Sequence, residues 1–223
     1  MVAEIHPWAV SIQDAFQIQK ELTGKLLFED DPDDPVLIAG VDVAFSRTRD
    51  LLYAAVVVVD SETMRSVEVV SAAQQPVFPY VPGLLTFREG PVVLQAYEKL
   101  KHAPDLLMFD GQGIAHPRGL GLAAHLGVIL DKPSIGCAKS RLVGEFKEPK
   151  QKRGAMRTLS LHRRKVGVVL RTKDNTKPLF VSPGHRITVE TAVKRVLEAG
   201  RGYRLPEPTR MAHLEASRAK RER

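Results

Sequence analysis

Two aspartates occupy positions where a carboxylate is costly unless it has a partner. Asp42 interrupts the apolar run 36–45, and Asp110 directly follows the four apolar residues 106–109. Aspartate is depleted in strands, and a buried carboxylate without a partner costs several kcal/mol. A bound cation is the simplest compensation for Asp42, and pairing with a buried Arg or Lys is the alternative.

The residues around Asp110 change from an apolar run to a glycine turn and then to helical periodicity. This order predicts a buried strand, a tight turn and a helix. In open α/β sheets ligands bind outside the carboxyl ends of strands, so Asp110 lies where a site is expected. The alternative is that Asp110 only caps the next helix, but the helical pattern begins near Gly119, too far along for a simple cap.

If the strands of Asp42 and Asp110 are neighbours, the two carboxylates converge. Glu89, near the start of a predicted helix over 92–102, could complete the cluster or could only favour the helix dipole. Such oxygen ligands suit Mg²⁺, with Mn²⁺ as a possible substitute. Carboxylate-held Mg²⁺ on a basic protein indicates phosphodiester chemistry.

Other cofactors fit the sequence less well. The loop histidines His116, His185 and His213 lack metal-ligand spacing with any cysteine, and Cys137 is the only cysteine in the chain. Zinc is therefore not expected. No Walker loop is present to indicate the use of a nucleoside triphosphate.

The elements that must hold these residues follow the order of a mixed α/β sheet. Apolar runs predict three strands joined by short turns, and then a strand, a helix and a strand: 36–45, 51–60, 62–75, 105–110, 119–130 and 132–139. Because a helix joins the last two strands, they should be parallel and adjacent. The expected fold is one α/β domain of residues 1–223, in which three antiparallel strands are followed by parallel strands and flanked by α-helices.

The remaining segments complete this domain. Helical spacing predicts an N-terminal helix over 11–22 and another helix over 188–199, and apolar runs predict strands over 166–170 and near 179–182. The basic segment 146–157 is expected to be a mobile, solvated loop. The basic C-terminal tail 206–223 is expected to be extended and carries His213.

A proline-rich loop precedes Glu89. Pro76, Pro79 and Pro82 restrict its backbone, and Gly83 supplies the freedom that a turn needs. Tyr80 is held between Pro79 and Pro82, so it cannot fold away easily. Either this ring is presented to a partner or it covers the edge of the core.

Composition limits the classes of partner. The 223 residues carry a net charge of +7 and an isoelectric point near 9.6, which favours polyanions, nucleic acid first. Part of the charge lies in 218–223, which could be only a solvated end. No signal-peptide pattern is visible and no apolar run approaches the ~20 residues of a membrane span. We expect a cytoplasmic monomer with no membrane partner.

Several segments together resemble the endonuclease V family of ribonuclease-H-like nucleases. The segments run from about Asp42 to His213: 40–45, 79–83, 87–91, 110–118, 136–140, 181–186 and 206–213. The combination of Asp-Gly-x-Gly-x-x-His-Pro with Pro-Tyr-x-Pro-Gly is specific. One departure is Ala124 before His125, where the family pattern has a serine, and it affects helix packing more than chemistry.

This resemblance implies a repair endonuclease that recognises deoxyinosine (hypoxanthine) in damaged DNA, double- or single-stranded. It implies a nick at the second phosphodiester bond 3′ to the lesion. Asp42, Asp110 and Glu89 would hold the metal, and Lys139 would contact the phosphate or stabilise charge at the reacting centre.

The resemblance also assigns residues that contact DNA. Tyr80, with Pro79 and Pro82, would wedge into the base stack while the base is extruded. Main chain near Gly83, Leu85 and Gly111 would line the base pocket, and Gly113 would be a further DNA-binding residue. His116 and His213 would assist near the metal or the phosphates.

Three alternatives remain open at this point. The enzyme could act on inosine-containing RNA, because contacts that sense a 2′-hydroxyl cannot be recognised in a sequence. It could be a nucleic-acid-binding module without activity, although Asp42, Glu89, Asp110 and Lys139 are all present. A phosphotransferase of the related actin-like fold needs two such domains, and this chain is long enough for one.

Overall fold

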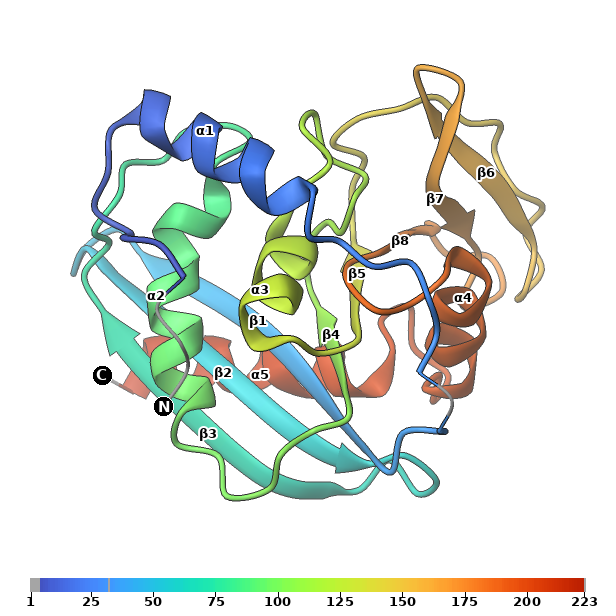
Figure 1. Ribbon diagram of the computed structural model, residues 1–223. Helices are drawn as coiled ribbons and strands as arrows, with labels where there is room; N and C mark the ends of the chain where they lie inside the picture. Colours follow the sequence, from blue (N-terminus) through green and yellow to red (C-terminus); the bar gives the residue numbers. More distant parts are fainter. Residues whose placement is uncertain (1–4, 32, 223) are drawn as a thin grey trace.

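The computed structural model describes residues 5–31 and 33–222. Residues 1–4, Pro32 of the acidic loop 29–35 and Arg223 of the predicted tail lie outside these ranges. An eight-stranded sheet of order β3-β2-β1-β4-β5-β8-β7-β6 crosses the molecule (Figure 1). Its strands are β1 Leu37–Ser46, β2 Leu51–Asp60, β3 Ser66–Gln74, β4 Leu106–Phe109, β5 Ser134–Ala138, β6 Met156–Leu161, β7 Arg164–Leu170 and β8 Leu179–Pro183.

The pairing confirms the predicted mixed sheet. β1, β2 and β3 are antiparallel neighbours, and β1, β4 and β5 pair in parallel. β5 then pairs antiparallel with β8, which pairs antiparallel with β7, and β7 with β6. The parallel order places the carboxyl ends of β4 and β5 beside the middle of β1, where Val41 pairs with Phe109.

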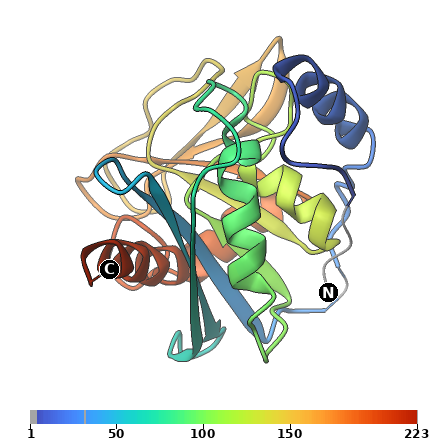
Figure 2. The ribbon, with the colours of Figure 1, turned by 90° about the vertical axis from the view of Figure 1, so that its left-hand side faces the viewer.

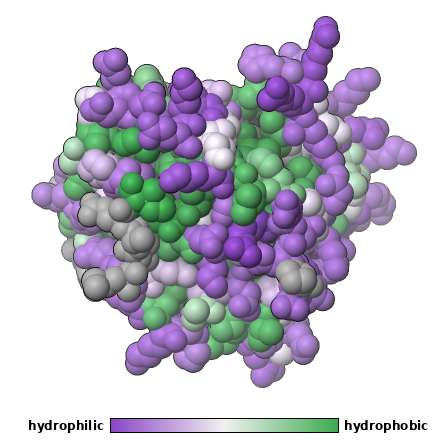
Figure 3. Space-filling view, in the orientation of Figure 1, coloured by the Kyte–Doolittle hydropathy of each residue, from purple (hydrophilic) through white to green (hydrophobic). Residues whose placement is uncertain are grey.

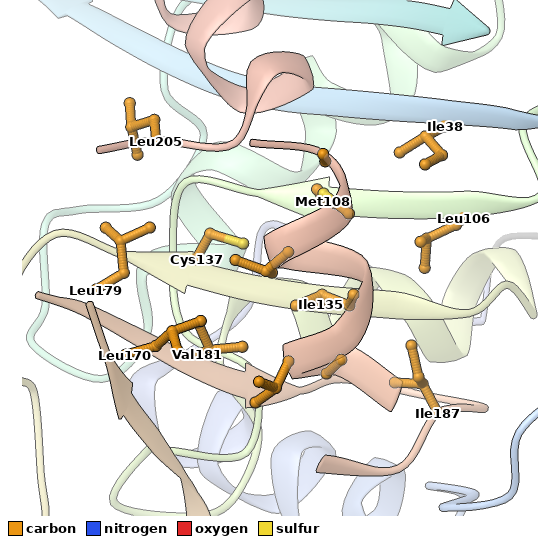
Figure 4. Packing of buried hydrophobic residues seen from close by; sticks show 14 of the residues in the cluster. Ile38, Leu106, Met108, Ile135, Cys137, Leu170, Leu179, Val181, Ile187 and Leu205 are labelled. Atoms are coloured by element: carbon orange, nitrogen blue, oxygen red, sulfur yellow. The ribbon is translucent and has the colours of Figure 1, made fainter. Parts of the chain in front are cut away.

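Helices cover both faces of the sheet (Figures 1 and 2). α2 (Leu85–Tyr97) and α3 (Leu122–Leu130) pack on one face, and α4 (Val189–Glu198) and α5 (Glu207–Glu222) pack on the other. Side chains alternate along each strand, so Ala39 and Val41 contact the first layer while Ile38 contacts the second. Figure 4 shows the core on the α4 and α5 side, where Met108, Ile135 and Cys137 pack together with their neighbours.

The N-terminal helix agrees with its prediction. α1 spans Ile12–Thr23, and the hydroxyl of its N-cap Ser11 accepts a hydrogen bond from the backbone N–H of Asp14. Leu22 packs against Leu120, Ala124 and neighbouring apolar residues. α1 therefore lies over the segment that connects β4 to α3.

The predicted start of α2 at Val92 was wrong. The helix begins at Leu85 and continues through Gly90 and Pro91, a pair that ordinarily marks a helix boundary. Tertiary packing overrides this local preference because Phe87, Val92 and Val93 are all buried. Glu89 consequently lies inside the helix and not at its start.

The prediction of an extended C-terminal tail was also wrong. Residues Glu207–Glu222 form α5, which packs against β1 and β2 through small residues, Ala212 and Ala216. A Cβ atom at Gly40 would lie 2.0 Å from the carbonyl oxygen of Pro208. Only glycine on β1 allows the start of this helix to approach the sheet so closely.

The solvated loop predicted over 146–157 is shorter than expected. Met156 and Arg157 begin β6, the edge strand, which was missed because its first three residues are exposed. The loop before it is fixed by Arg171, whose buried guanidinium donates to the Glu148 carboxylate and to the carbonyl oxygens of Pro149 and Lys150. Among the described helices, none is long and apolar enough to cross a membrane.

Candidate active site

The alternation of side chains on three neighbouring strands brings the acidic residues and the lysine together. Ile38 on β1, Met108 on β4 and Cys137 on β5 all contribute to the core beneath α4 and α5. Asp42, Asp110 and Lys139 lie four, two and two residues further along, so each is expected on this same face. The backbone N–H of Asp110 donates to the carbonyl oxygen of Val41 at 3.0 Å, which fixes the two carboxylates at the same level.

His213 completes this cluster from α5. Its Nδ1 lies 2.7 Å from Oδ2 of Asp42. One ligand atom from each of Asp42, Asp110 and His213 lies within 4.8 Å of the others, the arrangement of a potential metal site. The family resemblance predicts His213 near the metal or the phosphates, and the structure places it directly against a carboxylate.

Lys139 supplies positive charge beside the carboxylates. Its ammonium forms an ion pair with Oδ2 of Asp110 and lies 3.5 Å from Nδ1 of His213. Arg204 donates to the carbonyl oxygen of Lys139 at 2.5 Å and to that of Pro178 at 2.7 Å. Arg204 therefore holds the chain at the end of β5, a role that no local sequence pattern indicates.

Burial and neighbouring charges make the ionised carboxylates of this site costly. Burial raises the pKa of Asp42, and the charge of Asp110 raises it further, while His213 and Lys139 oppose the change. Burial and the charges of Asp42 and Asp110 raise the pKa of Glu89 from 4.5 to about 8, against the lowering effect of Arg88. Glu89 approaches from α2, in the opposite helix layer, and it is not part of the tight cluster of Asp42, Asp110 and His213.

These residues fit a divalent cation. Carboxylate oxygens are the ligands that hard cations such as Mg²⁺ and Mn²⁺ prefer, and imidazole is a ligand of transition metals such as zinc, copper, iron and nickel. Burial, together with the neighbouring carboxylate charges, raises the pKa of Asp42 and of Glu89, so the ionised carboxylates are costly here. A bound divalent cation would remove that cost by favouring the ionised carboxylates.

The proline-rich loop presents one aromatic ring to solvent and buries another. Phe78 is 3% exposed and packs against Phe87 of α2, with ring centroids 5.5 Å apart. Tyr80 is 71% exposed. Tyr80 therefore does not cover the core, because Phe78 has that position, and Pro79 and Pro82 are exposed beside it.

The carbonyl oxygen of Gly83 is the anchor of this loop. It accepts hydrogen bonds from Arg118 Nη2 at 2.6 Å, from Gln19 Nε2 at 3.0 Å and from His116 Nε2 at 3.0 Å. Gly83 has φ +78°, a conformation that favours glycine. The carbonyl oxygen of Gly83 thus links the loop by hydrogen bonds to α1 and to the segment after β4.

His116 takes part in this anchor and not in the carboxylate cluster. The backbone N–H of Arg118 donates to Nδ1 of His116 at 3.2 Å, so Nε2 carries the proton that is donated to Gly83. Burial and the charge of Arg118 lower the pKa of His116 to about 4. The buried imidazole therefore stays neutral at physiological pH.

Gln19 is a further residue of the anchor that sequence analysis missed. Its side chain is buried, its Nε2 also donates to the carbonyl oxygen of Leu120 at 3.2 Å, and its Oε1 accepts from Arg118 Nε at 2.5 Å. One amide thus joins α1, the proline-rich loop and the segment after β4. A polar residue within the apolar spacing of helix 11–22 was the only signal in the sequence.

The residues expected to line a base pocket, and Gly113, are placed differently from one another. Leu85, at the start of α2, is 37% exposed, and Gly111 is partly exposed after Asp110. Gly113 is buried: its N–H donates to Ser182 Oγ at 2.8 Å, and its carbonyl oxygen accepts from the N–H of Gly121 at 2.9 Å. Gly113 therefore supports the fold of this segment, whereas Leu85 and Gly111 are accessible.

Taken together, these features define a mixed α/β protein whose carboxylate site is suited to a divalent cation and to phosphodiester chemistry. A family model described as Endonuclease V matches residues 20–214. The endonuclease V of Methanothrix thermoacetophila is 50% identical over 210 residues, which are 94% of this chain and 92% of that protein. The chain belongs to the endonuclease V family and is an endonuclease.

Solved structures agree with this assignment. The crystal structure of endonuclease V from Streptomyces avermitilis is similar with a TM-score of 0.92 and 40% identity, covering 96% of this chain and 95% of that chain. Ciona intestinalis endonuclease V, solved in complex with a 24mer DNA containing an inosine followed by a ribo-adenosine, has a TM-score of 0.82 and 26% identity. That comparison covers 95% of this chain and 98% of the Ciona chain.

Proposed function

We propose that this endonuclease repairs DNA by recognising deaminated adenine, as deoxyinosine, and hydrolysing the second phosphodiester bond 3′ to the lesion with Mg²⁺. The observation that carries the proposal is the convergence of Asp42, Asp110 and His213 within 4.8 Å, beside Lys139. The Ciona relative bound to inosine-containing DNA supports the choice of lesion.

The metal would be held by Asp42 and Asp110, with His213 beside them and Glu89 completing the site once it is ionised. A bound Mg²⁺ or Mn²⁺ stabilises charge on the attacking and leaving oxygens of a phosphodiester. Lys139 adds a fixed positive charge beside the reacting phosphate, where it favours the more negative transition state.

Recognition of the lesion would be the task of the proline-rich loop. Tyr80, with Pro79 and Pro82, would fill the gap that an extruded base leaves in the stack. Extruding the base costs least when the base is mispaired. Accessible main chain near Gly83, Leu85 and Gly111 would contact the extruded base. His116 acts through Gly83 in this proposal, by holding the loop, and Gly113 acts by supporting the segment after β4.

Inosine-containing RNA is a second candidate substrate. The nucleic acid bound by the Ciona relative has a ribonucleotide directly after the inosine, so that relative accommodates a 2′-hydroxyl at this position. The same carboxylates would act on both substrates, and contacts with the 2′-hydroxyl would help to distinguish them.

A cleavage assay tests the proposal. Matched DNA and RNA strands, with and without one inosine, are incubated with the enzyme in Mg²⁺, in Mn²⁺ and in EDTA, and the product ends are mapped. We expect a Mg²⁺-dependent nick at the second bond 3′ to inosine in DNA. Cleavage in EDTA would exclude the metal site, and equal cleavage of strands without inosine would exclude the lesion specificity.

We further propose that the protein acts as a monomer in the cytoplasm, as expected from the sequence. It also includes a single functional domain. The continuous eight-stranded sheet and the match of the family model to residues 20–214 support that part.

A further inference from the structure

Positive charge is concentrated in one segment of the chain. Thirteen Lys and Arg residues but only three Asp and Glu residues lie between Lys139 and Lys177, a net charge of +10. The whole chain carries +7, so all other residues together are slightly acidic. This segment contains β6 and β7 and the loops beside them, at one edge of the sheet.

The hairpin of β6 and β7 displays much of this charge. In Figure 1 it projects at the upper right, on the same side as the loops that leave β4 and β5, and Figure 3 shows a hydrophilic surface with long side chains there. Arg157, Arg163 and Arg164 are exposed. Among the residues that the structure describes, these three form no ion pair, whereas Lys165 pairs with Glu190.

The tip of the hairpin holds His162 and Arg163 in an unfavourable conformation. Leu161 pairs with Arg164, so His162 and Arg163 alone form the turn. Their φ angles are +49° and +65°, a region that two-residue hairpin turns usually fill with Asn and Gly. Residues in sparsely populated conformations cluster at functional sites. Arg163 thus occupies the turn position that favours Gly, which supports a functional role for its guanidinium group.

We propose that the β6–β7 edge, with Arg157, Arg163 and Arg164 at its centre, binds the phosphate backbone of the substrate outside the lesion. Nucleic acid is the partner because the edge offers unpaired guanidinium groups, which suit phosphate oxygens. The inference rests on the proposed function for the identity of the substrate. The β6–β7 edge would be a second contact surface, which increases the affinity for nucleic acid without recognising the lesion.

The position of the edge sets which part of the substrate it reaches. β6 is three strands from β5 in the sheet, or roughly 14 Å at about 4.8 Å per strand. Lys139 follows the end of β5, and Arg157 is level with Ala138 through Val169 and Phe180. Arg157 therefore lies about four base pairs from Lys139 at about 3.4 Å per base pair, and Arg163 and Arg164, at the other end of the hairpin, lie further away. Only a duplex that extends past the lesion on one particular side can contact it.

A triple variant, Arg157→Gln with Arg163→Gln and Arg164→Gln, tests this surface. The matched control removes three cations that precede β3, β4 and β5, by Arg65→Gln with Lys101→Gln and Lys132→Gln. Each protein is titrated with undamaged duplex DNA over a range of salt. We expect the hairpin variant to lower the slope of log affinity against log salt by about 1–3, at about 0.9 per lost phosphate contact, and the control to leave the slope nearly unchanged.

Cleavage of three inosine-containing duplexes then locates the contact. One duplex has long arms on both sides of the lesion, one lacks the 5′ arm and one lacks the 3′ arm. The hairpin variant should have a raised KM and an unchanged kcat with the full duplex, and should match the wild type on one of the truncated duplexes. An unchanged salt slope, an equal effect of the control variant, or an equal defect on both truncated duplexes would overturn the inference.

The design separates this inference from the proposed function. Titration of undamaged DNA does not depend on inosine or on cleavage, so it reports on the edge even if the wild type fails to cut at inosine. If the wild type cuts at inosine and the hairpin variant retains the full salt slope, only the inference fails. Melting temperatures of both variants confirm that the fold is intact.

Discussion

Nδ1 of His213 lies 2.7 Å from Oδ2 of Asp42, although the two residues are 171 positions apart in the chain. The contact exists because α5 folds back over β1, where Gly40 allows the start of the helix to approach the strand. Asp42 and His213 thus depend on the same packing contact. The carboxylate cluster is a product of the tertiary fold and not of one local motif.

Asp42→Asn and Asp110→Asn should each reduce cleavage at inosine to background while lesion binding stays measurable. Each change removes a charged oxygen ligand and preserves the shape of the side chain. Cleavage and binding are measured in parallel in Mg²⁺. Asp60→Asn, at the carboxyl end of β2, where the Asp60 carboxylate accepts hydrogen bonds from Thr63, is the matched control. Full turnover by either cluster variant would rule out the metal site.

Glu89→Gln should stabilise the metal-free protein, and the gain should grow with pH. The pKa of Glu89 is about 8 in the folded protein and near 4.5 when exposed. Between these values the folded state keeps a proton that the unfolded state releases, so stability falls as pH rises from about 4.5 to about 8. The neutral amide of the variant removes this dependence.

Thermal unfolding in EDTA at pH 5 and at pH 8 checks this expectation. The variant should melt within about a degree of the wild type at pH 5 and several degrees higher at pH 8, because about 2–4 °C corresponds to 1 kcal/mol in a protein of this size. Mg²⁺ should stabilise the wild type more than the variant at pH 8. A melting difference that is the same at both pH values would show that Glu89 ionises normally.

Gln19→Ala should impair both stability and lesion recognition. The change removes the hydrogen bonds to Gly83, Leu120 and Arg118, at about 1 kcal/mol each. Because Gly83 anchors the loop of Tyr80, KM for inosine-containing duplex should rise more than kcat falls. Gln17→Ala, on the exposed face of the same helix, is the control and should behave as the wild type. Unaltered KM in Gln19→Ala would show that the anchor does not serve recognition.

The strands that carry Asp42 and Asp110 could be predicted because they are continuous apolar runs, each with one acidic residue that needs an explanation. The parallel pairing of β4 with β5 followed from the intervening helix. β6 could not be predicted in the same way. Met156 and Arg157 are exposed, so the strand shows no alternation of buried and exposed residues.

The place of His213 could not be predicted from the sequence for a different reason. α5 packs through Ala212 and Ala216 within a strongly charged segment, so its buried face lacks the large apolar residues that mark an amphipathic helix. The one local signal was Glu207 and Pro208 in the first turn, which favour a helix start. Likewise, Gln19 is informative only when its three partners are known.

Tyr80→Ala should weaken discrimination between inosine-containing and normal duplex while the fold stays intact. Tyr80 is 71% exposed, and Phe78 holds the loop against α2, so the ring can be removed without opening the core. A loss of about 1–3 kcal/mol is expected if stacking of the ring on bases is the main contribution. Phe78→Ala is the opposite case and should lower the melting temperature by creating a cavity.

The substrate dependence distinguishes a wedge from a general contact. A wedge fills the gap that an extruded base leaves in a duplex, and its insertion offsets part of the cost of unstacking. A single strand has less stack to hold open, so the defect of Tyr80→Ala should be smaller when inosine lies in a single strand. The ratio of duplex to single-strand activity should therefore fall in the variant, at an unchanged melting temperature. An unchanged ratio would exclude the wedge, because a simple surface contact would be lost equally on both substrates.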